Sequence, residues 1–294
     1  MANSINTNRG ALVALQTLNA TNKALETTQN RVNTGMKVSS AKDNGAIYAI
    51  ATAQRAEMGA QDAVKQSLQR GQSIVDVALA AGETVVDALT ELKSLAVAIQ
   101  DAAAGSSSLT KLNNDFSAIV AEIKTALKGA TFDGVNLFAA NPDADEPIKV
   151  TTNTSGGTFD LKDAAPAAAT GAYLTTGEVD ATQGVYPDPD DPGEEISFDL
   201  DTLADRTPAN VEAAINNFTT ILAELGTKSK SLDRQLSFVS KLQDSLETGI
   251  GNLVDADLAK ESARLTALQT KQQLGVQALS IANSSSSILL GLFR

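Results

Sequence analysis

The feature that most constrains the fold is an apolar periodicity in which steps of four and three residues alternate over long stretches. In residues 64–99 this spacing holds without a break, and a second lane of apolar residues at intervals of seven runs beside it over 74–95. Such spacing gives a wide apolar stripe along one side of an α-helix. Small residues within the stripe, Gly71 and Gly82 among them, permit close packing of a second helix.

The same spacing returns in two later stretches, residues 109–126 and 211–253. The second stretch follows Thr207, a good N-cap residue, and Pro208, which suits the first position of a helix. A continuous helix over 211–253 would be roughly 65 Å long at 1.5 Å per residue. That length is too great for a compact globule, so it predicts a rod, with the glycines of the stretch as points where the helix could bend.

Both ends of the chain repeat the pattern with more polar residues in the seam. Leu18, Leu25 and Val32 lie at intervals of seven, and the stepping from Leu258 to Phe293 is similar. Helices of this kind are poor helices in isolation and need packing against other elements. The chain also finishes on the apolar run "ILLGLFR", which requires a core, a membrane or another molecule to bury it.

Residues 133–206 differ from the rest of the chain in composition. They hold six of the seven prolines, and 16 acidic against three basic residues, which is a net charge of −13. Within them "NTSGGT" separates "IKVTT" from "FDL", a pattern typical of a β-hairpin. The sequence therefore predicts a mainly α protein. Its N- and C-terminal arms form a long antiparallel helical rod or coiled coil, and a small β-containing tip lies in the middle.

The composition excludes several classes of function. The chain has no cysteine and no histidine, so it lacks disulfides, thiolate zinc sites and the commonest general base. The net charge of −12 argues against nucleic acid as a partner. No run of eighteen apolar residues is present, which argues against membrane insertion, and the N-terminus lacks the pattern of an ordinary secretory signal. We therefore expect neither an enzyme nor a cofactor.

Three acidic or glycine-containing motifs are candidates for chemistry. The loop "YPDPDDPGEE" is a weak calcium candidate, but its spacing does not match an EF-hand, so a solvated acidic loop is favoured. Asp255 and Asp257 are expected to cap helices rather than to act as paired catalytic carboxylates. "AKDNGAIYA" lacks the lysine of a phosphate-binding loop. The carboxylates of the calcium candidate are Asp188, Asp190, Asp191, Glu194 and Glu195.

The two ends of the chain resemble one family. "INTNRGALVALQTLNATNKALETTQNRVNTGMKVSSAKDNGAIYAIA" is similar to the N-terminal arm of bacterial flagellins. "LVDADLAKESARLTALQTKQQLGVQALSIAN", together with the closing "LLGLFR", is similar to their C-terminal arm. The resemblance covers roughly the first 140 and the last 90 residues. The short acidic middle resembles that of alphaproteobacterial flagellins.

The resemblance implies a structural subunit that self-assembles into the flagellar filament for swimming motility. It divides the chain into inner-shell terminal helices at 1–42 and 255–294, a helical rod at 43–132 and 207–254, and an outer segment at 133–206. It also implies an extracellular location, reached unfolded through the flagellar type III export apparatus. The alternatives are a hook–filament junction protein, which shares related arms, and a coiled-coil adapter.

The partners implied are other copies of this chain or other flagellins in a mixed filament, hook-junction and cap proteins, and an export chaperone. The apolar seams of the two terminal arms are the expected polymer interface. The residues expected there are Ile5, Leu12, Leu18, Leu25, Val32, Leu258, Leu265, Leu268, Leu279, Leu289, Leu290 and Phe293.

Two further expectations follow from the resemblance. The family's contact with a vertebrate innate receptor maps to the helix containing Leu89–Val97. Recognised flagellins carry an arginine where this chain has Glu91, so we expect poor recognition. Flagellins often carry O-linked sugars, and the candidate sites here are Ser106, Ser107, Ser108, Thr152, Thr154 and Ser155.

Overall fold

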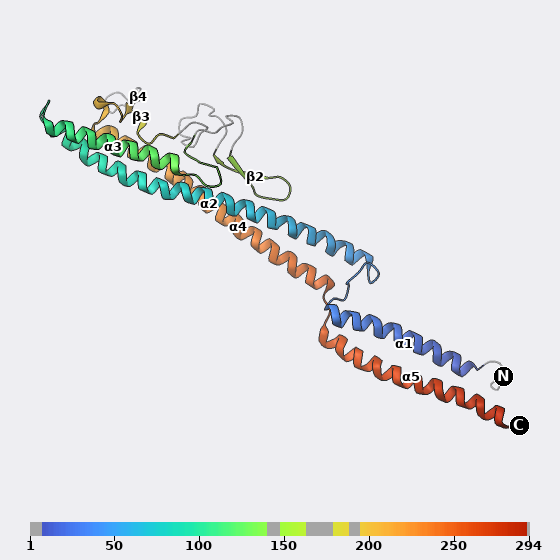
Figure 1. Ribbon diagram of the computed structural model, residues 1–294. Helices are drawn as coiled ribbons and strands as arrows, with labels where there is room; N and C mark the ends of the chain where they lie inside the picture. The colour runs from blue at the N-terminus through green and yellow to red at the C-terminus, as the bar shows by residue number, and fades with distance from the viewer. Residues whose placement is uncertain (1–7, 140–147, 163–178, 188–194, 293–294) are drawn as a thin grey trace. The chain divides into compact units, whose positions relative to one another are not determined.

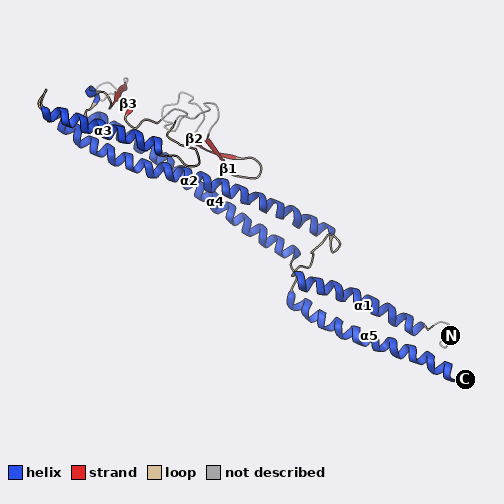
Figure 2. Cartoon of the chain, in the orientation of Figure 1, coloured by secondary structure: helices blue, strands red, loops and turns tan. Residues whose placement is uncertain are grey.

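The computed structural model describes residues 8–139, 148–162, 179–187 and 195–292, which are coloured along the chain in Figure 1. Helices dominate this part of the chain, and strands are confined to its middle (Figure 2). The expected mainly α class is therefore confirmed. The α-helices are α1 (Arg9–Thr34), α2 (Gly45–Asp101), α3 (Ser107–Gly129), α4 (Pro208–Val254) and α5 (Leu258–Leu292), with a short 3₁₀ helix at Leu203–Asp205.

The helices begin where the sequence places capping residues. α4 starts at Pro208, and the backbone N–H of Asn210 donates to the Thr207 hydroxyl at 3.2 Å. In α3 the N–H of Leu109 donates to the hydroxyl of Ser106 at 3.1 Å. Each hydroxyl satisfies one of the donors that a helix start leaves without an intrahelical partner. α4 then runs 47 residues without interruption through its glycines, so the possible breaks do not occur.

The predicted hairpin is present. Strand β1 (Ile148–Thr151) pairs antiparallel with β2 (Thr158–Lys162). In the turn between them the carboxamide oxygen of Asn153 accepts the backbone N–H of Gly157 at 2.7 Å. Gly156 adopts φ of 87°, a conformation that only glycine takes without strain. The side-chain acceptor and the glycine together fix the turn.

A second antiparallel pair was not predicted. It consists of β3 (Gln183–Pro187) and β4 (Glu195–Asp199) and forms a separate two-stranded sheet. β4 leads through Leu200 and the 3₁₀ helix into α4. Because Pro187 ends β3 and acidic residues surround both strands, the sequence here resembles a solvated loop more than a strand.

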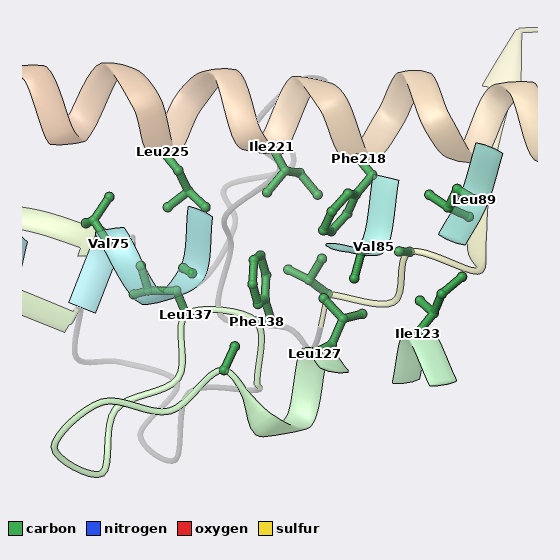
Figure 3. Packing of buried hydrophobic residues seen from close by; sticks show 14 of the residues in the cluster. Val75, Val85, Leu89, Ile123, Leu127, Leu137, Phe138, Phe218, Ile221 and Leu225 are labelled. Atoms are coloured by element: carbon green, nitrogen blue, oxygen red, sulfur yellow. The ribbon is translucent and has the colours of Figure 1, made fainter. Parts of the chain in front are cut away.

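The chain divides into two compact units, residues 59–243 and residues 1–58 with 244–294. In the first unit α2, α3 and α4 enclose one hydrophobic core, shown in Figure 3. Phe138 from the loop after α3 and Phe218 of α4 pack there with ring centroids 5.8 Å apart. Leu89 of α2, Ile123 of α3 and Leu225 of α4 are fully or almost fully buried around them.

Glycines in the stripe of α2 allow close packing, as the periodicity predicts. A Cβ on Gly71 would lie 2.6 Å from a methyl carbon of Val150 in β1. A Cβ on Gly82 would collide with the side chain of Leu222 in α4. Real Cβ atoms do not approach other atoms so closely, so glycine at these positions lets the hairpin and α4 pack directly on the α2 backbone.

The second unit contains α1 and α5, which lie side by side (Figure 1). It also contains the segment between α1 and α2, the start of α2 and the end of α4. Val38, Ala51, Ile250 and Val254 from these parts form a small buried cluster. The carbonyl oxygen of Val254 accepts the N–H groups of Lys37 and Val38 at 2.6 and 3.2 Å. These bonds tie the segment after α1 to the end of α4.

Candidate subunit interface

The contact between α1 and α5 mixes apolar and polar groups. A guanidinium nitrogen of Arg31 donates to the Glu261 carboxylate at 3.2 Å. Further along, the Gln272 carboxamide donates to the Asn22 side chain at 2.9 Å. Polar pairs of this kind fix which residues of two helices face each other, but they add less stabilisation than apolar packing. The pairing of α1 with α5 is therefore specific and only modestly stable by itself.

The expected interface residues fall into three groups. Six of them are half-buried along the α1–α5 contact: Leu18, Leu25, Val32, Leu265, Leu268 and Leu279. Leu12 and Leu258 are exposed. Leu289 and Leu290 lie within α5, but their side chains, like the whole of Ile5 and Phe293, fall outside the described residues.

Both helices also carry large apolar residues that face away from their contact. On α5 Leu274 is 58% exposed and Ile281 is 69% exposed, and Val276 is exposed beside them. On α1 Val13 and Leu15 are exposed as well. Leu274 and Ile281 belong to a second lane, seven residues apart, which is visible in the sequence but was not among the expected interface residues. An exposed apolar series of this kind is typical of a surface that binds another molecule.

Buried polar atoms in this unit also lack partners. The Nε of Arg31 and the Oε2 of Glu261 are shielded from solvent and form no hydrogen bond within the described part of the chain. Buried polar atoms of native proteins are nearly always paired with protein or water. The Arg31–Glu261 pair therefore leaves one buried polar atom on each side chain without a partner within the described residues.

Two carboxylates accept hydrogen bonds next to helix starts in this unit, Asp43 before α2 and Asp257 before α5. Before α2, one oxygen of Asp43 accepts the N–H and hydroxyl groups of both Ser39 and Ser40 at 3.0–3.2 Å. The N–H of Ser39, its hydroxyl and the N–H of Ser40 hold the pKa of the Asp43 carboxyl below its usual range. At the start of α5 the Asp257 carboxylate accepts the N–H of Lys260 at 3.1 Å, which confirms the expected capping role. Asp255 lies just after α4, where its backbone N–H donates to the carbonyl oxygen of Gly251 at 2.8 Å.

In the unit of residues 59–243, ion pairs join α3 to the residues that flank β3 and β4. Lys124 forms ion pairs with Asp180, at 3.6 Å, and with Asp201. Burial alone would lower the pKa of Lys124, but the hydrogen bond that its ammonium donates to Asp201 and the charges of Asp180, Asp201 and Asp199 raise the pKa overall. Burial lowers the pKa of Arg206, although the charge of Asp201 opposes this effect.

The remaining candidates are placed as follows. Asp188, Asp190, Asp191 and Glu194 lie outside the described residues, as does the side chain of Glu195 at the start of β4. Among the residues described, no group of three or more acidic side chains is arranged to hold a metal ion.

The sugar candidates and Glu91 are in described segments. Ser107, Ser108, Thr154 and Ser155 are exposed, Thr152 is half-buried, and Ser106 is half-buried with its hydroxyl engaged as the α3 cap. Glu91 is exposed on α2.

No helix in the described ranges is long and apolar enough to span a membrane.

Comparisons with known proteins agree with the resemblance at both ends of the chain. Residues 5–143 match the model of the bacterial flagellin N-terminal helical region, and residues 209–293 match that of the C-terminal helical region. The chain is 47% identical to flagellin FljM of Caulobacter vibrioides over 292 residues, 99% of either chain. It is 41% identical to a flagellin of Brucella melitensis over 291 residues, again 99% of either chain. A crystal structure of Bacillus cereus flagellin aligns with 68% of this chain and 94% of its own, at 13% identity and a TM-score of 0.33.

Proposed function

This chain belongs to the bacterial flagellin family, and on that premise we propose that α1 and α5 supply the contacts that join neighbouring subunits. As a flagellin it is a structural subunit of the flagellar filament, and the family is a structural one, found outside the cell. Because the relatives matched over the full length are flagellins, the hook–filament junction and adapter alternatives are set aside.

One observation carries the proposal, namely the apolar lane of Leu274 and Ile281 on the outer side of α5. α1 already covers the opposite lane, which leaves this one free to contact another polypeptide. Burying one such side chain contributes on the order of 1.5–3 kcal/mol. Repeated along two helices in every subunit, this contribution is large enough to drive assembly even though the α1–α5 pair is modestly stable alone.

The experiment is polymerisation of the purified chain from short filament seeds. Monomer below a critical concentration should sediment as a small species, and above it should pellet as long filaments visible by electron microscopy. We expect the terminal segments to gain protection from hydrogen exchange on assembly, because their exposed faces become buried. A chain that stays monomeric with seeds at high concentration would overturn the proposal.

The partners and the route of export extend the same proposal. We propose that this chain also enters mixed filaments, since several flagellins of one bacterium, including FljM, FljK and FljO, resemble it to a similar degree. Contacts with cap and hook-junction proteins, an export chaperone and passage through the type III channel are proposed from family membership alone. Copolymerisation with a second flagellin, read out by immunogold labelling along single filaments, tests the mixed state.

Glu91 is proposed to weaken recognition by the vertebrate receptor of flagellins. Its carboxylate is exposed on α2 and only accepts hydrogen bonds, whereas an arginine there would donate up to five. Loss of an arginine hot spot costs about 2 kcal/mol or more, roughly a thirtyfold loss of affinity. Glu91→Arg is expected to raise binding of the monomer to the receptor ectodomain in a direct assay, with Glu91→Gln as the charge control. Tight binding by the unmodified monomer would contradict this expectation.

A further inference from the structure

One side of α2 carries a row of like charges. Glu83, Asp87 and Glu91 lie at intervals of four residues, which places them on the same face of the helix, and all three are exposed. None of them takes part in an ion pair within the described residues. Like charges at this spacing oppose helix formation. In a single subunit the row, here called the acidic face, is therefore unfavourable and uncompensated.

A face of opposite charge lies on α4. Lys230, Arg234, Phe238 and Lys241 follow one another at steps of four, four and three, and so share one side of the helix. All are exposed, and Phe238 is 66% exposed although the chain has few aromatic residues. Lys230 and Arg234 form no ion pair in the part of the chain that is described. This row is here called the basic face.

The two faces lie at different levels of the same unit, so they do not meet within one chain. Gln72 of α2 donates to Ser229 of α4 at 2.7 Å, and Gln243 of α4 donates to Asp62 of α2 at 2.6 Å. The basic face therefore lies beside residues 62–72 of α2. The acidic face is centred about 20 residues further along α2, or about 30 Å at 1.5 Å per residue.

We propose that the acidic face of one subunit binds the basic face of a second copy of this chain in the filament. The faces are complementary in charge, both are exposed, and both belong to one unit. A contact between two different surfaces of identical subunits repeats from one subunit to the next, and it propagates into an open polymer when its rotation does not close a ring. Phe238 supplies the apolar anchor that a charged interface requires at its centre. This contact rests on the proposed function and adds a rod-to-rod interface to that of α1 and α5.

Charge reversal tests the contact in the seeded polymerisation assay. Glu83→Lys with Asp87→Lys makes the acidic face basic, and Lys230→Glu with Arg234→Glu makes the basic face acidic. Either pair alone places like charges across the contact and is expected to raise the critical concentration at least about tenfold. All four substitutions in one chain restore opposite charges, and the critical concentration should return to within about threefold of the unmodified value.

A matched control separates the contact from net charge. Asp115→Lys with Glu122→Lys on α3 changes the net charge by the same amount and in the same direction as Glu83→Lys with Asp87→Lys, at exposed positions outside both faces. This control is expected to assemble like the unmodified chain. Circular dichroism should show equal helix content in every variant. The milder variant, Glu83→Gln with Asp87→Asn, should raise the critical concentration by a smaller factor than the charge-reversed pair does.

The outcomes distinguish this inference from the proposed function. If the unmodified chain polymerises and either reversed face assembles equally well, the contact does not exist. The same holds if the α3 control is impaired as strongly as the face variants, or if four substitutions are worse than two. If the unmodified chain itself does not polymerise, the proposed function is overturned and the contact with it. The pairing of these two faces is supported if both double variants assemble poorly and the fourfold variant assembles at the critical concentration of the unmodified chain.

Discussion

A subunit carrying Leu274→Asp and Ile281→Asp is expected to fold like the unmodified chain and to be excluded from filaments. Both side chains are mostly exposed in the single chain, so their replacement removes little packing from the α1–α5 contact. In the filament each would place a carboxylate in an apolar contact without a partner. The loss of burial alone is about 1.5–3 kcal/mol per side chain, so we expect the critical concentration to rise by at least about a hundredfold.

The matched control for this prediction is Leu203→Asp. Leu203 lies in the 3₁₀ helix before α4, is 68% exposed, and belongs to the other unit of the chain. The Leu203→Asp substitution should leave both helix content and assembly unchanged. Pelleting at normal yield by the Leu274/Ile281 variant would show that the outer lane of α5 does not face a neighbouring subunit. An equal defect in the Leu203 variant would show that the assay reports solubility rather than a specific contact.

The helices of this protein could be predicted because the signals that specify them are local. The four–three spacing marks the buried stripe of α2, and Thr207 with Pro208 marks the start of α4. The hairpin β1–β2 was likewise predictable, because asparagine and glycine between two apolar runs specify a turn within a few residues. In each case the information lies within the element itself or in the residues directly beside it.

The contacts that hold the strands to the rest of their unit were not predictable, because each depends on residues distant in sequence. Lys162 is completely buried in β2, where its ammonium group donates to the backbone oxygens of Leu137 and Ala139 at 3.1 and 2.6 Å. A lysine in an alternating polar segment is ordinarily expected in solvent. Only the fold reveals that carbonyl groups converge on this position.

The candidate interface was predictable in part for the same reason. The lane of Leu265, Leu268 and Leu279 is continuous in the sequence, and it is half-buried against α1. The parallel lane of Leu274 and Ile281 is equally visible. Two polar pairs across the contact, Arg31–Glu261 and Asn22–Gln272, fix which of the two lanes meets α1. Sequence periodicity gives the lanes, and long-range polar pairing selects between them.

Arg206, which is 6% exposed, links the segment that follows β4 to α3. Its guanidinium donates to the backbone and side-chain oxygens of Asn113 at 2.8 and 3.1 Å and to the Ser117 hydroxyl at 2.8 Å. It also donates to the carbonyl oxygens of Leu200 and Asp201 at 3.2 and 3.1 Å. The group lies over the ring of Phe116, 5.0 Å from its centre. One planar cation thus joins α3 to the segment that follows β4.

Replacing this residue by Arg206→Met is expected to lower the free energy of unfolding by about 3–5 kcal/mol, measured by urea titration with circular dichroism. Methionine fills a similar volume but leaves the carbonyl oxygens of Asn113, Leu200 and Asp201 without their donors. Arg206→Lys keeps the charge and should recover only part of the loss, because one ammonium group cannot reach both sides of the site as a planar guanidinium does. The expected order of stability is therefore arginine, lysine, methionine. Equal stability of the arginine and methionine forms would mean that the outer segment is held by its apolar contacts alone, with Phe198 and Leu200 as the residues responsible.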